Sequence, residues 1–145
     1  MYCNKLDYRM NNGRFPISLH ILTLLASANG ELLSSDYIAG SININPVLVR
    51  KEISNLRNRG LVESKEGKNG GSTLARPAGD ILLSEIYHAV QQVSLLGNSK
   101  NTPNPACLVG KQINQHLDHL YQEIESALVH KLEKITLADF LLQFG

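Results

Sequence analysis

The sequence has 145 residues, enough for one domain, or for one domain with an appended helix, to bury a core. Hydrophobic residues make up 43% and charged residues 19%, the composition of a soluble globular protein. The two cysteines show no pairing pattern, which excludes a disulfide framework and favours a reducing cytoplasm. Because the net charge is only +1, any basic surface must come from local clustering.

The chain begins with a polar segment, residues 1–12, which we expect to be a flexible tail. A helix is expected over 15–28. Its apolar stripe consists of Phe15, Leu19, Leu22 and Ala26. A secretory signal is the alternative, because basic residues precede an apolar run that ends on small residues. His20 interrupts that run, so a core helix is favoured, and the run is too short to span a bilayer.

A helix-turn-helix is predicted from 34 to 59. The first helix begins at Ser34, and the chain then turns through 40–44, where Asn43 suits a positive φ. Asn45 is a favoured N-cap, and Pro46 suits the first position of the second helix. One face of that helix is apolar, with Val49, Ile53 and Leu56. The opposite face is largely basic, with Val47, Arg50, Lys51, Ser54 and Arg57.

A β-hairpin, or wing, is predicted directly after this helix. Gly60 can end the helix in the left-handed conformation, and strands over 61–66 and 72–75 flank a glycine-rich loop. Between 50 and 76, seven basic residues stand against three acidic ones, a local charge of +4. From 112 to the last residue, two lysines stand against five acids, a local charge of −3. A local basic patch is the electrostatic footprint expected where phosphates dock.

The second half of the chain is predicted to be helical. A helix is expected over 82–92, with Ile86, Ala89, Val90 and Val93 facing inward. The loop 94–105 is rich in Ser, Asn, Gly and Pro. The longest helix is expected over 108–131, with an apolar seam of Ile113, Leu117, Leu120, Ile124 and Leu128. Thr136 is expected to cap a last helix over 137–144.

These elements predict a mainly α fold with a small β-hairpin wing. A winged helix-turn-helix DNA-binding domain is expected over 13–80, followed by a linker loop and a helical dimerisation region over 81–145. The apolar seam of the long helix is either a dimer interface or intramolecular core. Because a small winged domain has little left with which to cover so long a helix, a homodimer is favoured.

The order of these parts resembles the Rrf2 family of bacterial transcriptional regulators. The motifs that carry the resemblance are Gly60-Leu61-Val62, the glycine loop 67–71, Leu74-Ala75-Arg76-Pro77 and Ile135-Thr136-Leu137-Ala138-Asp139. The stretch 104–110 is most similar to the YwnA-like subgroup, and the whole match covers about residues 10–145. The resemblance implies a winged helix-turn-helix homodimer whose long C-terminal helix crosses to its partner.

One departure from the family concerns the cofactor. Many members hold an iron–sulfur cluster through three cysteines in the loop between the wing and the dimer helix. Here that loop offers only Cys107, and Cys3 lies in the predicted tail. A cluster usually takes about four protein ligands, so we expect no cofactor.

The DNA-binding residues are expected on the second helix and the wing. Candidates for contacts to base edges are Arg50 and Lys51, followed by Asn45 and Val47 at the start of the same helix. Ser54 and Arg57 are further DNA-binding candidates on that helix. Candidates for contacts to the DNA backbone or the minor groove are Lys65, Lys68 and Asn69. A solvated basic face is the alternative for the helix, and a plain hairpin turn is the alternative for the wing tip.

Two further residue groups are candidates for other chemistry. His116 and His119 lie on the long helix, but surface histidines are favoured over a metal site because no closed ligand set is visible. Cys107 immediately precedes that helix, where unpaired N–H groups favour a thiolate, and Lys111 adds positive charge one turn on. Cys107 is therefore a candidate redox sensor, the alternative being a small buried apolar residue.

The predicted function is that of a sequence-specific transcriptional regulator, a repressor that binds a palindromic double-stranded DNA operator as a homodimer. Thiol modification or a small-molecule effector is the expected means of control. A winged-helix module that binds protein instead of DNA is the alternative. No nucleophile–base pair, phosphate loop or carboxylate dyad stands out, so no enzyme is expected. We expect a cytoplasmic protein without a membrane partner.

Overall fold

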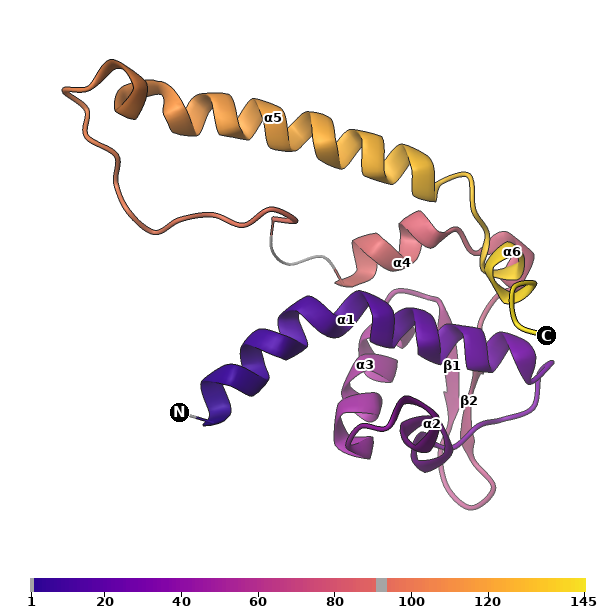
Figure 1. The fold of residues 1–145 in the computed structure, drawn as a ribbon. Helices are drawn as coiled ribbons and strands as arrows, with labels where there is room; N and C mark the ends of the chain where they lie inside the picture. The colour runs from indigo at the N-terminus through magenta and orange to yellow at the C-terminus, as the bar shows by residue number, and fades with distance from the viewer. Residues whose placement is uncertain (1, 91–93) are drawn as a thin grey trace.

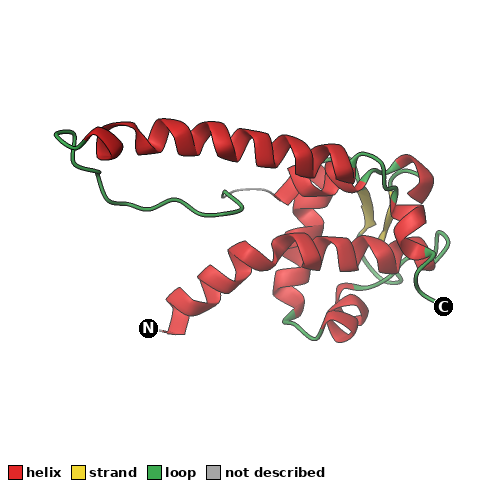
Figure 2. Cartoon of the chain, turned by 45° about the horizontal axis from the view of Figure 1, so that its top comes forward, coloured by secondary structure: helices red, strands yellow, loops and turns green. Residues whose placement is uncertain are grey.

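The computed structural model describes residues 2–90 and 94–145, with side chains from residue 13 onward in these ranges (Figure 1). The elements in chain order are α1 (Tyr2–Ser27), α2 (Ser35–Ile42), α3 (Pro46–Asn58), β1 (Val62–Lys65), β2 (Gly71–Leu74), the short 3-10 helix η1 (Ala78–Asp80), α4 (Leu83–Val90), α5 (Leu108–Leu132) and α6 (Leu137–Leu141). Helices dominate, and the strands of the described chain form one antiparallel hairpin, as Figure 2 shows. The predicted mainly α fold with a small β-hairpin wing is confirmed.

Helix α1 begins earlier than predicted. It starts at Tyr2 rather than at Phe15, because no glycine or proline between 2 and 12 interrupts helix propagation. Pro16 lies inside the helix, where its ring removes one backbone hydrogen bond, and Figure 1 shows α1 changing direction along its length. The side chains of residues 1–12 are outside the described set, so the flexible tail stays a prediction.

The helix-turn-helix forms as the local signals predict. The Ser34 hydroxyl accepts from the Tyr37 N–H at 3.1 Å at the start of α2, and the Asn45 side chain accepts from the Val47 N–H at 2.9 Å at the start of α3. Each side chain satisfies a backbone donor that the helix itself cannot pair. Asn43, between the two helices, has φ of 63°, so the predicted left-handed turn residue is confirmed.

The wing is a short hairpin attached to the segment before α2. Val62 pairs with Leu74, and Lys65 pairs with Gly71, so β1 is shorter than the predicted 61–66, and β2 begins and ends one residue before the predicted 72–75. Ser72 also exchanges two backbone hydrogen bonds with Leu33, at 2.9 and 3.0 Å. A Cβ at Gly71 would lie 2.6 Å from the Leu33 carbonyl oxygen, so this close strand approach requires glycine.

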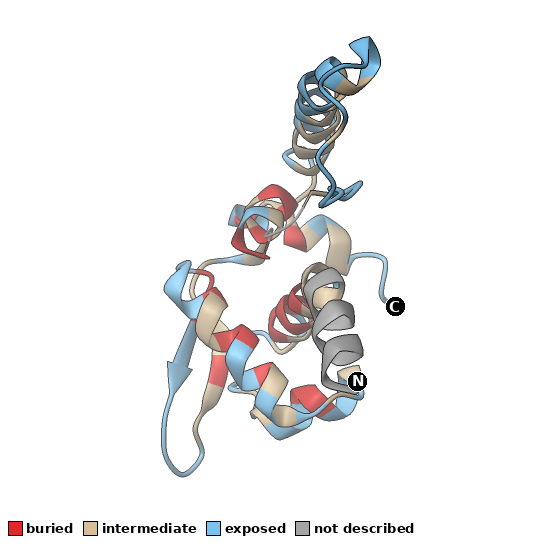
Figure 3. Ribbon diagram, turned by 90° about the vertical axis from the view of Figure 1, so that its left-hand side faces the viewer, coloured by how far each residue is buried: buried red, intermediate tan, exposed pale blue. Residues whose placement is uncertain are grey.

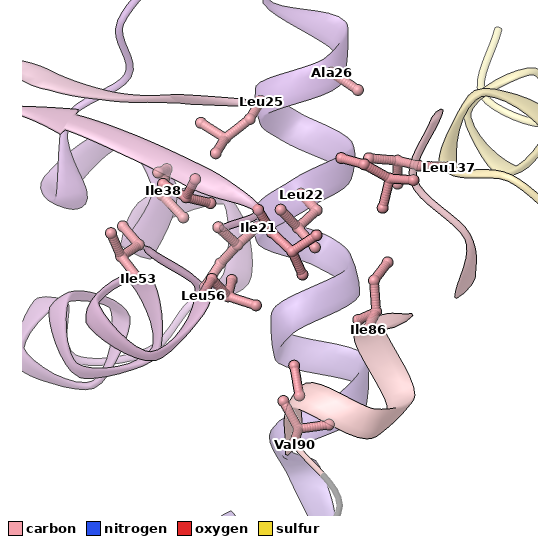
Figure 4. Packing of buried hydrophobic residues seen from close by; sticks show 14 of the residues in the cluster. Ile21, Leu22, Leu25, Ala26, Ile38, Ile53, Leu56, Ile86, Val90 and Leu137 are labelled. Carbon is pink, nitrogen blue, oxygen red and sulfur yellow. The ribbon is translucent and has the colours of Figure 1, made fainter. Parts of the chain in front are cut away.

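The hydrophobic core surrounds the C-terminal half of α1. Its fully or nearly fully buried side chains are Ile21, Leu22, Leu25, Ala26, Ile38, Ala39, Val49, Ile53, Leu56, Leu61, Val62, Ile81, Leu83, Ile86, Ala89, Val90 and Leu137. In the view of Figure 4, α1 runs between Leu56 of α3 and Ile86 of α4. The predicted apolar face of α3 is therefore confirmed, whereas Phe15 and Leu19 of the predicted α1 stripe lie only half-buried at the edge of the core.

The core extends past residue 80, the predicted end of the DNA-binding domain. The Leu83 N–H donates to the Ile135 carbonyl at 2.9 Å, and the Leu137 N–H donates to the Ile81 carbonyl at 2.8 Å, which joins the start of α4 to the start of α6. Thr136 caps α6 as expected, in a capping box with Asp139, although this helix ends at Leu141 rather than at Phe144. Both α4 and α6 also pack on α1.

Helix α5 stands apart from this core. It spans nearly the range predicted for it, and none of its side chains is buried. Figure 3 shows it projecting from the body of the molecule, and it packs mainly on α4. Burial, and then the negative charge of Glu125 on α5, raise the pKa of Tyr87 on α4 above its ordinary value. None of the helices in the described ranges is long and apolar enough to cross a bilayer.

Candidate nucleic-acid interface

The outward face of α3 presents the residues of this helix that the sequence predicts to bind DNA. Asn45, Val47, Arg50, Lys51 and Arg57 are exposed, and Ser54 is half-buried. Val47 is an apolar side chain with 59% of its surface exposed near the start of the helix. Because the opposite face carries Val49, Ile53 and Leu56 into the core, the helix cannot rotate without exposing them.

A groove of about 490 Å³ separates α3 from the wing. Its walls bring together four of the predicted DNA-binding residues, which are Arg50, Ser54, Arg57 and Lys65. Four serines that were not predicted also line it, Ser34, Ser35, Ser64 and Ser72. Asp36 and Glu66 oppose the basic residues there. The groove therefore combines guanidinium, ammonium and hydroxyl donors, the groups that bind phosphate oxygens.

The other predicted residues lie outside this groove. Asn45, Val47 and Lys51 are on α3 but do not line it, and Lys68 and Asn69 are at the hairpin tip. Asn69 has φ of 65°, and a Cβ at Gly70 would collide with the Lys65 carbonyl oxygen, so the tip is a tight, glycine-dependent turn. The exposed side chain of Lys68 therefore extends from a fixed backbone beyond the groove.

The basic charge of the interface is carried by side chains without an acidic partner. Two ion pairs form among the described residues, Arg14–Glu52 and Arg76–Glu85. Of the charged residues between 50 and 76, only Glu52 and Arg76 take part in these two pairs. Six basic residues stay exposed, Arg50, Lys51, Arg57, Arg59, Lys65 and Lys68, against exposed Glu63 and Glu66. The predicted local charge of +4 is therefore unchanged, but it resides on α3 and the wing alone.

A buried polar network holds α3 in place, and the sequence reasoning missed it. Arg14 of α1 donates two hydrogen bonds to the Glu52 carboxylate, at 3.0 and 3.1 Å. Asn55, one turn further along α3, donates to Glu52 at 3.2 Å and to the Ala89 carbonyl of α4 at 3.0 Å. Glu52 lies three residues after Val49 and four before Leu56, so helical spacing places it on the buried face. That spacing could have predicted its burial from the sequence.

A second ion pair joins the end of the wing to α4. Arg76 donates to Glu85 at 2.8 Å, and the Leu82 N–H donates to the same carboxylate at 2.9 Å. Burial alone would raise the pKa of Glu85, but these two hydrogen bonds and the charge of Arg76 outweigh it, so its pKa is lowered.

The seam of α5 is only partly covered. Ile113, Leu117, Ile124 and Leu128 are half-buried, and Leu120 is 47% exposed. Helix α5 has no buried residue, so the seam is not part of the buried core of the described chain. The described chain therefore leaves a long apolar stripe open.

The described residues do not fit an iron–sulfur cluster. Cys107 is an exposed free thiol at the N-cap of α5, and the side chain of Cys3 is outside the described set. His116 and His119 are exposed, and no group of three or more His, Cys, Asp or Glu residues in the described chain could hold a metal ion. The alternative prediction of a buried Cys107 is wrong, because the residue precedes a helix that stands away from the core.

Comparison with known proteins places this architecture among DNA-binding regulators. The family model Rrf2, "Iron-dependent Transcriptional regulator", matches residues 12–143. The "Putative HTH-type transcriptional regulator YwnA" of Bacillus subtilis (strain 168) is 39% identical over 132 residues, covering 91% of this chain and 97% of that protein. A protein of Lactococcus lactis with the same description, YffB, is 29% identical, with coverage of 83% and 80%.

Solved structures show the same arrangement of elements. One described as "a putative DNA binding protein" is 34% identical, with a TM-score of 0.71, and the match covers 88% of this chain and 98% of that one. CymR, the global cysteine regulator of Bacillus subtilis, is 26% identical, with a TM-score of 0.67 and coverage of 91% and 95%. These structures confirm the predicted winged helix-turn-helix fold.

Proposed function

The chain belongs to the Rrf2 family of transcriptional regulators, and from that premise we propose that it is a repressor that binds a palindromic DNA operator as a homodimer. We place the protein in the cytoplasm, together with the DNA that it binds. A dimer that covers its operator excludes other proteins from that stretch of DNA, which is the simplest route to repression.

The observation that carries the DNA-binding part is the basic groove between α3 and the wing. Arg50 and Arg57 on α3 face Lys65 on β1 across a groove of about 490 Å³, and none of the three forms an ion pair in the described chain. The charges of Arg57 and Lys65 are therefore available to phosphate oxygens. With α3 in the major groove, its exposed N-terminal residues Asn45, Val47 and Arg50 are the ones that reach base edges.

The apolar stripe on α5 supports the dimer. The stripe runs along a helix of 25 residues, and a second copy of the same helix would cover it by knobs-into-holes packing. In a two-fold dimer, the two α3 helices would face half-sites one helical turn apart, or a multiple of it. An operator with inverted symmetry follows from that geometry.

The DNA-binding proposal is tested by the salt dependence of binding to a mixed-sequence duplex. Neutralising two groove residues, in Arg57→Gln/Lys65→Gln, should weaken binding and lower the magnitude of the salt slope by about two, since each phosphate contact contributes about 0.9. The matched control is Lys131→Gln/Lys134→Gln, which removes two exposed charges far from α3. Equal loss in both double variants would contradict the groove as the phosphate site.

The proposed control through Cys107 rests on its exposure and its position at the N-terminus of α5. Modification of this thiol would add bulk where the linker loop meets α5, the proposed dimer helix. The orientation of the two DNA-binding domains relative to each other would then change. Operator binding should fall after mild diamide treatment in the wild type and not in Cys107→Ser, with Cys3→Ser as the control. If the wild type and Cys107→Ser respond alike, the thiol is not the switch.

A further inference from the structure

An apolar groove of about 480 Å³ lies between α1 and α6, away from the basic groove. Its apolar walls are Pro16, Leu19 and Leu24 of α1, and Phe140, Leu141 and Phe144 at the other side. Figure 1 shows α6 beside the C-terminal half of α1. The volume falls within the range of about 300–1,000 Å³ that is typical of small-molecule sites.

The groove leaves an aromatic surface open to solvent. The rings of Phe140 and Phe144 meet edge to face, with their centroids 5.4 Å apart, and 60% of the Phe144 surface is exposed. An occupant that covers these rings removes apolar surface from water, which favours binding.

The polar groups of the groove are few, and most already have partners. The Thr23 hydroxyl donates to the Leu19 carbonyl at 2.6 Å, and the Ser27 hydroxyl donates to the Leu24 carbonyl at 2.7 Å, both within α1. The remaining pair is His20 and Ser41, whose Nε2 and Oγ atoms lie 2.9 Å apart. None of the described side chains that line the groove is an Asp, Glu, Lys or Arg.

We infer that this groove binds an uncharged, mostly apolar small molecule that carries a single polar group. Its apolar body would cover the two phenylalanine rings, and its polar group would exchange a hydrogen bond with His20 or Ser41. A charged ligand is disfavoured, because desolvating a charge is costly where no opposite charge lines the site.

A ligand at this position would also act on the helix-turn-helix, and this part rests on the proposed function. The His20–Ser41 contact ties α1 to the last turn of α2, two residues before Asn43 turns the chain toward α3. A ligand that forms a hydrogen bond with His20 or Ser41 competes with the hydrogen bond between these two residues. The positions of α2 and α3 relative to α1 are then less fixed, and the affinity for DNA falls.

Binding is tested on the full chain without DNA, with phenylnaphthylamine, an uncharged fluorescent probe with one N–H group. We expect saturable enhancement with a single site in each chain, and loss of it in Ser27→Trp, which fills the groove from an exposed position. The matched control, Gln143→Trp, adds the same ring at an exposed position outside the groove and should bind as the wild type does. Ser27→Asp, which puts an unpaired charge in the groove, is a second block should Ser27→Trp fail to fold.

Competition identifies the ligand class. Naphthol should displace the probe, and the naphthoate anion should do so about tenfold more weakly, which corresponds to about 1.4 kcal/mol. Equal probe binding by both tryptophan variants, equal competition by naphthol and naphthoate, or binding that strengthens on dilution because another copy covers the groove would each overturn the inference.

The regulatory effect is read separately, as the affinity of the protein for its selected operator at saturating probe. We expect a fall in the wild type and no change in Ser27→Trp. Probe binding with unchanged operator affinity would overturn the regulatory part. A chain that binds no DNA at all would contradict the proposed function instead, while the probe result would still stand.

Discussion

Arg14 of α1 and Glu52 of α3 form a forked ion pair, with guanidinium–carboxylate distances of 3.0 and 3.1 Å. Only 7% of the surface of Glu52 is exposed. A two-point contact between planar groups fixes orientation as well as distance. Because Arg50 and Glu52 lie on the same helix, this pair sets how α3 is rotated on α1, and with it which side chains face outward.

Replacing Arg14 should therefore destabilise the fold. Arg14→Leu leaves the Glu52 carboxylate buried, with the Asn55 amide as its one remaining donor among the described side chains, so we expect the free energy of unfolding to fall by about 3 kcal/mol. The double variant Arg14→Leu/Glu52→Leu removes both charges and should recover most of that loss. Urea unfolding of the three proteins measures both effects. A double variant no more stable than Arg14→Leu would show that the buried charge is not the cause.

Arg50 and Lys65 should affect DNA binding in different ways. Arg50→Ala should reduce discrimination at one base pair in each half-site by about 1–3 kcal/mol, because an arginine can read guanine through two hydrogen bonds. Lys65→Ala, like Lys68→Ala, should instead weaken binding to all sequences alike and reduce the salt slope by about one. Titrations with the operator and its single-base variants separate the two. If both changes act independently of sequence, Arg50 is not a base reader.

The α5 seam should hold the dimer together. Ile124→Asp places a charge in the middle of the proposed interface, where it has no partner, so we expect monomers or an unfolded chain in sedimentation experiments. Ser126→Asp, an exposed position on the same helix, adds the same charge and should leave the dimer intact. A wild-type chain that sediments as a monomer at micromolar concentration would rule out the dimer.

The Arg76–Glu85 pair should make stability depend on pH in the acid range. The pKa of Glu85 is lowered from an ordinary value of 4.5, so the folded state binds its proton less readily than the unfolded state does. Its contribution is therefore present above that ordinary value and is lost as the pH falls through the lowered pKa. The stability difference between the wild type and Glu85→Gln, followed by thermal unfolding, should shrink on acidification. A difference independent of pH would contradict this assignment.

Features set by a few neighbouring residues were predictable from the sequence. Asn45 followed by Pro46 specifies a helix start, Asn43 tolerates the left-handed turn, and the glycines of 67–71 allow a tight hairpin. The exposed face of α3 follows from the same periodicity that buries Leu56. The candidate DNA-binding residues were accessible to sequence reasoning for that reason.

Features that depend on distant contacts were not predictable. Nothing near Glu52 in the sequence indicates that its partner is Arg14, thirty-eight residues earlier. The return of α6 to the core likewise depends on Leu137 meeting α1 and α4, which no local pattern encodes. The groove beside Phe140 forms only when α6 packs on α1, so its residues come from α1, α2, α6 and the segment after α6.

Selection of bound duplexes from a random pool tests the central claim most directly. The full wild-type chain should enrich an inverted repeat whose half-site centres lie one helical turn apart or a multiple of it, about 34–36 Å per turn. A parallel selection with Arg50→Ala should enrich the same repeat with one position in each half-site relaxed. Enrichment of no sequence, or of a single half-site without symmetry, would contradict the proposal that this chain is a dimeric, sequence-specific regulator.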